Sequence, residues 1–192
     1  MRRVTLNRRT SRFRSIKSFM LIPLFTLLTA CGGVDVIQYA DRSPKFDLFQ
    51  YFTGQTRGWG VVMDRSGTVT RQFVVDIVGT ESDDNTIVLD EDFIWNDGEK
   101  TKRIWTITKT GPQSYSGSAD DVSGTASGKT AGNALNWTYV LKISVGDDVW
   151  NITFDDWMFL QPDGVLLNKA IMSKWGIRVG EVIISFSKPT TS

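Results

Sequence analysis

The sequence predicts an all-β domain whose antiparallel strands run up and down and close into a barrel after a short N-terminal tether. Two observations carry this prediction. Apolar and polar side chains alternate in ten successive runs, and turn-forming residues separate most of these runs at intervals of roughly ten residues. A third observation concerns the first 30 residues, whose composition differs from that of the rest and indicates where the domain works.

Residues 1–30 have the composition of a secretory signal peptide. They hold seven of the 22 basic residues and no acidic residue, and an apolar run covers 19–28. Such a short apolar core between a basic segment and small residues is typical of a signal peptide and too short for a membrane-spanning helix. We expect residues 1–30 to be removed.

The end of this segment defines the type of signal. Leu28-Thr29-Ala30-Cys31 resembles the lipobox of bacterial lipoproteins, which implies a diacylglycerol and acyl chains such as palmitate on Cys31 and cleavage before it. Gly32 follows where an aspartate would retain the protein in the inner membrane, so the resemblance implies an outer-membrane anchor facing the periplasm. Two or three acyl chains are enough for stable anchoring. The alternatives are a buried free thiol, or an accidental cysteine in an ordinary signal peptide.

Removal of the signal peptide changes the charge of the chain. The 22 basic and 21 acidic residues become 15 and 21, a net charge of about −6. An acidic surface argues against a nucleic-acid partner and against electrostatic docking on anionic lipid. Cys31 is the only cysteine, so a disulfide within the chain is excluded.

Residues 31–52 are expected to be the lipidated N-terminus and the tether. The tether ends in a short helical or irregular turn, and Phe46, Leu48, Phe49 and Phe52 give it an apolar side. Residues 53–190 form the single barrel domain.

The strands follow in order, each with alternating or β-branched and aromatic residues. They are expected at 57–64, 68–79, 86–95, 100–109, 113–120, 122–129, 134–145, 148–160, 164–174 and 180–188. Short turns such as 65–67, 96–99 and 162–164 favour antiparallel neighbours. Closure into a barrel removes exposed edges, and a two-sheet β-sandwich is the alternative.

Four ionisable residues interrupt the apolar faces of these strands. They are Glu91, Arg103, Asp156 and Lys169. Burying an unpaired charge is costly, so we expect them to pair with one another or to line a wet cavity. The alternatives are internal salt bridges without further role, or β-bulges that turn these residues to the surface.

The chemistry open to the chain is limited. It has no histidine, which excludes Ser-His-Asp and Cys-His catalysis and argues against a zinc or iron site. No phosphate-binding loop is present, and no metal or cofactor is expected. A pair such as Glu91 with Asp156 would suit glycoside hydrolysis only at a separation of about 5 to 9 Å. We expect binding and no enzymatic activity.

Seven tryptophans, most of them in the expected strands, suggest an aromatic pocket. A barrel of this size encloses at most a small ligand, and aromatic walls are common in such pockets. Core packing is the alternative for at least half of them. The candidate ligand-binding residues are Trp59, Glu91, Trp95, Arg103, Trp105, Trp137, Asp156 and Lys169.

Several motifs carry a family resemblance. They include residues 52–55, 58–61, 64–67, 89–93, 97–99, 154–158 and 172–176, which together resemble an uncharacterised proteobacterial lipoprotein family of unknown function. Gly58-Trp59-Gly60 also resembles the Gly-x-Trp motif of lipocalins, with Arg178 in the place of their late-strand arginine. This second resemblance implies a lipocalin-like, calycin-type barrel and leaves function open.

Two functions from different classes remain. The first is a carrier of a lipid or small hydrophobic ligand, held at the outer membrane and facing the periplasm. The second is a non-catalytic structural or assembly factor of the envelope that binds another protein. A packed interior would leave only the second.

Overall fold

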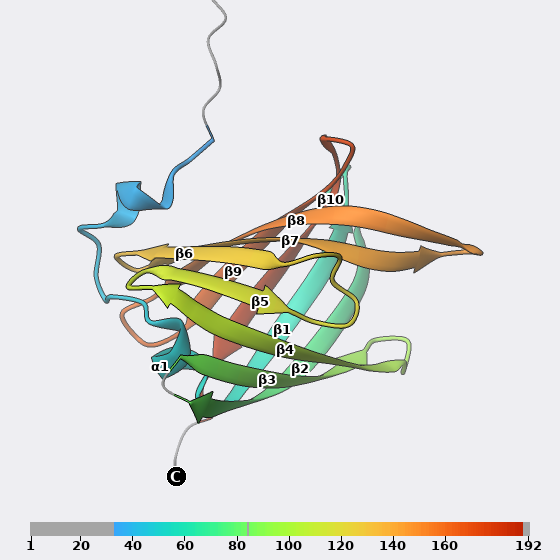
Figure 1. The fold of residues 1–192 in the computed structure, drawn as a ribbon. Coiled ribbons are helices and arrows are strands. Elements are labelled where there is room, and N and C mark those ends of the chain that lie inside the picture. Colours follow the sequence, from blue (N-terminus) through green and yellow to red (C-terminus); the bar gives the residue numbers. More distant parts are fainter. Residues whose placement is uncertain (1–32, 84, 190–192) are drawn as a thin grey trace, which may run out of the picture. The chain divides into compact units, whose positions relative to one another are not determined.

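The computed structural model describes residues 33–83 and 85–189, and these form a barrel of ten antiparallel strands preceded by two short helices (Figure 1). The expected signal peptide and Cys31 lie outside the described residues. The ten strands expected from the sequence are all present. Their bounds are β1 (Gly54–Asp64), β2 (Val69–Asp83), β3 (Thr86–Trp95), β4 (Lys100–Gly111), β5 (Ser114–Ser118), β6 (Ala126–Ala131), β7 (Ala134–Val145), β8 (Asp148–Leu160), β9 (Leu166–Lys174) and β10 (Ile177–Ser187).

The barrel closes through its first and last strands. Each strand pairs with its neighbours in sequence, and β1 also pairs with β10, from Arg57 opposite Ser187 to Asp64 opposite Gly180. A sandwich would have left edge strands in two separate sheets. The prediction of an up-and-down barrel is therefore confirmed and the sandwich alternative is wrong.

The segment before the barrel contributes to the core. It contains the 3-10 helix η1 (Val36–Tyr39) and the helix α1 (Leu48–Phe52), which begins where the Asp47 side chain accepts a hydrogen bond from the Gln50 backbone N–H at 3.0 Å. The buried side chains of α1 belong to the barrel core, and the Phe52 ring meets the Phe186 ring edge to face at 5.8 Å. The short helical turn with an apolar side, expected at the end of the tether, is therefore present, and its apolar side is buried in the barrel core.

One part of the wall is made by a loop. In the described chain, β5 pairs with β4 only from Thr106 onward, and β6 pairs with β7 only up to Thr138. Beyond these points, residues 119–125 lie between β4 and β7. The Lys142 N–H donates to the Asp121 carbonyl at 2.8 Å, which ties this loop to β7.

None of the described helices is long and apolar enough to cross a membrane.

Candidate ligand-binding cavity

The barrel encloses a cavity of about 490 Å³. The helix α1 and every strand except β5 and β6 contribute to its wall. Leu48 and Phe52 of α1 lie at one end, and Arg71, Lys102 and Lys142 are basic residues of the lining. Most of the wall is aliphatic or aromatic, so it is suited to contact an apolar part of a ligand.

Aromatic side chains form much of this wall. The Trp105 ring meets Trp137 at 5.6 Å and Tyr139 at 5.3 Å between centroids, in both cases edge to face, and Tyr139 stacks on Phe154 at 5.1 Å. Edge-to-face and offset contacts are the favoured arrangements of aromatic rings. These rings therefore hold each other in place around the cavity.

Glycines make room for Trp137. A Cβ at Gly128 would lie 2.3 Å from the Trp137 ring, and a Cβ at Gly117 would lie 2.7 Å from it. Both distances are far below van der Waals contact. The Trp137 indole therefore occupies the space that a side chain at either glycine position would need.

Another tryptophan lies under a basic residue. The Arg71 guanidinium carbon lies 4.0 Å from the centroid of the Trp95 ring, and Arg71 Nη2 is 2.7 Å from both Asp97 Oδ2 and Glu99 Oε2. The ion pairs and the cation–π contact hold the guanidinium over the Trp95 ring.

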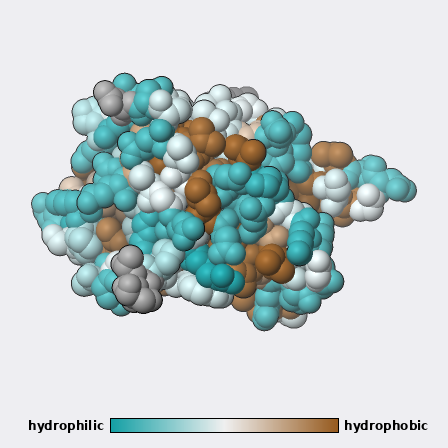
Figure 2. Space-filling view, turned by 90° about the horizontal axis from the view of Figure 1, so that it is seen from below, coloured by the Kyte–Doolittle hydropathy of each residue, from teal (hydrophilic) through white to brown (hydrophobic). Residues whose placement is uncertain are grey.

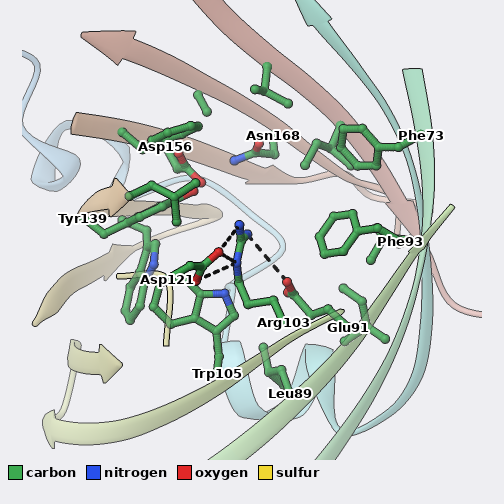
Figure 3. A pocket seen from close by; sticks show the side chains of 18 of the residues that line it. Phe73, Leu89, Glu91, Phe93, Arg103, Trp105, Asp121, Tyr139, Asp156 and Asn168 are labelled. Carbon is green, nitrogen blue, oxygen red and sulfur yellow. Dashed lines mark hydrogen bonds and ion pairs between the residues drawn. The ribbon is translucent and has the colours of Figure 1, made fainter. Parts of the chain in front are cut away.

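A polar cluster interrupts the apolar wall (Figure 3). Arg103 of β4 contacts Asp121 of the 119–125 loop through Nε at 2.9 Å and Nη2 at 2.8 Å, both to Oδ2. Its Nη1 lies 3.9 Å from Glu91 Oε2 on β3. The short contacts show that Asp121 is the main partner of Arg103 and that Glu91 is a weaker one.

Two carboxyl groups of this region have strongly raised pKa values. Burial raises the pKa of Glu91 to about 7, and the Arg103 charge opposes the rise. Burial, together with the negative charge of Asp155, raises the pKa of Asp156 to about 8. Both groups therefore change protonation near neutral pH.

Asp156 and its neighbour Asn168 carry unused hydrogen-bonding capacity. Both residues are over nine-tenths buried and line the cavity. Among the described residues, Asp156 Oδ1, Asn168 Oδ1 and Asn168 Nδ2 have no partner at hydrogen-bond distance and angle. The Asn168 amide is nevertheless close enough to the Asp156 carboxyl group to lower its pKa slightly against the effect of burial. Buried polar groups normally have partners, so this wall is suited to a polar group of a ligand.

The structure brings six of the eight candidate residues to the cavity wall. They are Glu91, Trp95, Arg103, Trp105, Trp137 and Asp156. Three of the four ionisable residues that interrupt the apolar faces, Glu91, Arg103 and Asp156, line the cavity as expected.

Trp59 is not at the cavity, contrary to the prediction. Its side chain is 49% exposed on the outside of β1. The inward positions beside it are Gly58 and Gly60, and the rings of Phe186 and Phe73 occupy the space that side chains there would take. Rings from β10 and β2 thus fill the space on the inner side of β1 at these two positions.

Lys169 also lies outside, which corrects its assignment to an apolar inner face. Its Nζ is 3.3 Å from Glu181 Oε2 and its side chain is 55% exposed. The inward residues of β9 are Leu166, Asn168 and Ala170. The sequence of β9 has apolar residues on both faces, so alternation alone did not distinguish them.

Two residues of the polar cluster were not predicted. Asn168 would have been found by choosing the other face of β9. Asp121 lies in a loop, where no periodicity indicates direction, and only its contact with Arg103 places it. In the part of the chain that the structure describes, no group of three or more acidic, cysteine or histidine side chains is arranged to hold a metal ion.

Comparisons with known proteins agree with the fold. A protein-family model described as "Protein of unknown function (DUF3833)" matches residues 25–188. The solved structure of the S-type phycobiliprotein lyase CPES from Guillardia theta is similar, with a TM-score of 0.53 and 10% identity over 75% of this chain and 92% of that chain. No curated protein matches. The similarity to CPES supports the fold alone, and the barrel is lipocalin-like as predicted.

Proposed function

This chain belongs to the DUF3833 family of proteins of unknown function, and we propose that it binds one small amphipathic molecule with an apolar body inside its barrel. The observation that carries the proposal is the cavity of about 490 Å³. Ligand pockets commonly have about 300 to 1,000 Å³, with mostly apolar walls and a few polar groups that orient the ligand. The proposal is of binding and carriage, with no reaction assigned to the cavity.

The interior is more consistent with a ligand site than with a packed core. A core built only for stability does not leave an internal space of this size, nor buried polar atoms without partners. Both features occur together at Asp156 and Asn168. A bound molecule would fill the space and satisfy the polar atoms.

The test is to fill the cavity by mutation. Ala170 is buried in the wall of β9, and Leu167 on the same strand is 45% exposed on the outside. We expect Ala170→Trp to weaken binding of a saturable amphiphile at least tenfold, measured by quenching of tryptophan fluorescence, and Leu167→Trp to leave it unchanged. Ala170→Leu serves if the larger side chain prevents folding.

Native mass spectrometry of the purified barrel gives an independent result. We expect a bound small molecule that mild solvent extraction removes and that rebinds with one-to-one stoichiometry. Protein that is empty when isolated and shows no saturable binding of amphiphiles would contradict the proposal.

We also propose that Cys31 carries the lipid anchor and that the barrel faces the periplasm from the outer membrane. The support is the lipobox-like sequence 28–31 and Gly32 after the cysteine. Metabolic labelling with an alkynyl palmitate should label the wild-type protein and not Cys31→Ser. Recovery of the label in the variant, or of the wild-type protein in the inner-membrane fraction, would contradict this placement.

A second candidate function, docking on another envelope protein, is supported by exposed apolar side chains on two hairpins. Val149 and Trp150 lie on the β7–β8 hairpin, and Trp175, which is 88% exposed, lies on the β9–β10 hairpin. Figure 2 shows hydrophobic side chains on the projecting hairpin at the right. A photo-crosslinker at Val149 should capture one dominant partner in intact cells, whereas one at Val78 on the outer wall should not.

A further inference from the structure

The charges around Arg103 are unbalanced. Arg103 shares its part of the cavity wall with three carboxyl groups, Glu91, Asp121 and Asp156. The other basic residues of the lining have partners elsewhere, because Arg71 pairs with Asp97 and Glu99, Lys102 pairs with Asp90 and Asp92, and Lys142 donates to the Asp120 carbonyl. Asp121 already holds Arg103 through two short contacts. The cluster therefore lacks positive charge when its carboxyl groups are ionised.

The carboxyl group with the fewest partners is also deeply buried. Asp156 is 7% exposed, and its Oδ1 has no hydrogen-bond donor among the described residues. The Oδ1 of Asn168, which is 2% exposed, likewise lacks a donor. Figure 3 shows both side chains on the same side of the cavity, opposite Glu91 and Phe93.

The vacant acceptors define the chemistry of the missing group. Two oxygens without donors, beside more carboxyl groups than cations around Arg103, fit a group that has several N–H donors and a positive charge. A ligand carboxylate would instead compete with Asp121 for Arg103 and would meet three carboxyl groups. An alcohol could donate to one of these oxygens and accept from the unpartnered Asn168 Nδ2, but it would bring no charge.

We propose that the cavity selects molecules with a protonated amine on an apolar chain, and that Asp156 and Asn168 receive the ammonium group while Glu91 contributes negative charge. The aromatic and aliphatic wall takes the chain. This inference rests on the proposed ligand-binding function and names the ligand class of that same cavity.

Amine binding would depend on pH. Asp156 and Glu91 bind the ammonium group only when ionised, so affinity should rise as pH increases through 7 to 8 and fall again when the amine loses its proton, near pH 10. The other charged or titratable groups around these two are Arg103, Asp121 and Tyr139 in the cavity, and Asp90 and Asp155 nearby. Arg71, Lys102 and Lys142 also line the cavity.

The experiment compares three probes with the same alkyl chain, which are dodecylamine, dodecanol and dodecanoate, each at a concentration at which it stays monomeric in solution. At pH 8 we expect dodecylamine to bind at least tenfold more tightly than dodecanol and dodecanoate to bind most weakly. Calorimetry at pH 7.5 in two buffers of different ionisation enthalpy should show net proton release for the amine alone.

Matched variants locate the preference. Asp156→Asn and Glu91→Gln keep side-chain shape and should each reduce the ratio of amine to alcohol affinity at least fivefold. Asp92→Asn removes a neighbouring charge on the outer face of β3, where Asp92 lies 3.2 Å from Lys102, and should leave the ratio unchanged. Thermal melts establish that each variant is folded.

The possible results separate the two proposals. Equal or tighter binding of the alcohol or the acid, or an unchanged ratio in both cavity variants, overturns the amine inference and leaves the carrier function standing. Failure of all three probes to bind overturns both.

Discussion

Asp156 shows how one residue links burial, stability and binding. Its carboxyl group lies between Phe154 and Met158 on the inward face of β8, and the residue is 7% exposed. Keeping a titratable group in this position without a bound partner reduces stability, because desolvation penalises the charged form. Functional sites often carry such a penalty.

This penalty predicts a pH-dependent effect of Asp156→Asn on stability. Because the pKa of Asp156 is raised from 3.8 to about 8 in the folded protein, the folded state holds a proton that the unfolded state releases above about pH 4. The contribution of Asp156 to stability therefore falls as pH rises from about 4 to 8. Asp156→Asn should stabilise the protein by about 1 to 3 kcal/mol more at pH 8 than at pH 5.

Thermal unfolding of both proteins at pH 5 and pH 8 measures this difference. Asp92→Asn, on the outer face of β3, is the control and should show no such dependence. An equal shift of the midpoint at both pH values for Asp156→Asn would show that the carboxyl group is not buried.

Gly128 gives a second prediction about a single residue. A methyl group there would lie 2.3 Å from the Trp137 ring, so Gly128→Ala must displace the indole. We expect a loss of about 1 to 3 kcal/mol in the free energy of unfolding and a shifted tryptophan emission maximum. Gly111→Ala, whose Cβ would meet its nearest neighbour at 3.7 Å, should change neither quantity. Unchanged emission in Gly128→Ala would place Trp137 elsewhere.

Among the elements, the 119–125 loop is the part of the wall with the fewest strand contacts. Backbone hydrogen bonds tie it to β7, and an isolated bridge joins Val122 to Leu141. On the other side, the Arg103 to Asp121 ion pair connects it to β4. Because these few contacts hold the loop, we expect it to be more easily displaced than the paired strands and to affect how fast a ligand enters and leaves.

The loop predicts a kinetic effect of Asp121→Asn. Loss of the ion pair should speed association and dissociation of a bound amphiphile at least threefold in stopped-flow fluorescence. Because Asp121 is 38% exposed, the free energy of unfolding should fall by no more than about 1 kcal/mol. Asp120→Asn is the control, because it leaves the ion pair between Arg103 and Asp121 in place, and it should leave both rates unchanged. Unaltered rates in Asp121→Asn would direct attention to another route.

At the scale of the whole molecule, strand pairing is uneven around the closed barrel, and we expect local stability to be uneven too. The wall is continuous where β1 pairs with both β2 and β10, whereas between β4 and β7 it depends on two short strands and a loop. Regions with few paired backbone groups open locally at lower free energy. We therefore expect the wall around β1 to resist local opening more than the wall between β4 and β7.

Hydrogen exchange followed by mass spectrometry tests this distribution. Peptides from β1 and β10 should exchange slowest, and those from residues 119–125 should exchange at least tenfold faster. A bound amphiphile should slow exchange in the loop more than in β1. Uniform protection around the barrel would mean that the loop is as stable as the strands.

Much of the fold could be predicted from local patterns. Alternation and turn residues identified ten strands, and β3, β7 and β8 have the expected bounds. These features are legible because side-chain alternation and turn chemistry depend only on neighbouring residues. Glu91, Arg103 and Asp156 could be selected as candidates because each interrupts an otherwise apolar face.

What the sequence by itself determined is the all-β, up-and-down architecture and the presence of ionisable residues inside it. Only the tertiary structure decided which face of β1 and β9 points inward, and so placed Trp59 and Lys169 outside and Asn168 inside. It alone brought Asp121 to Arg103 and left Asp156 and Asn168 without partners. The reason is physical: alternation defines two faces of a strand, but the packing of distant strands decides which face is buried and which polar atoms meet.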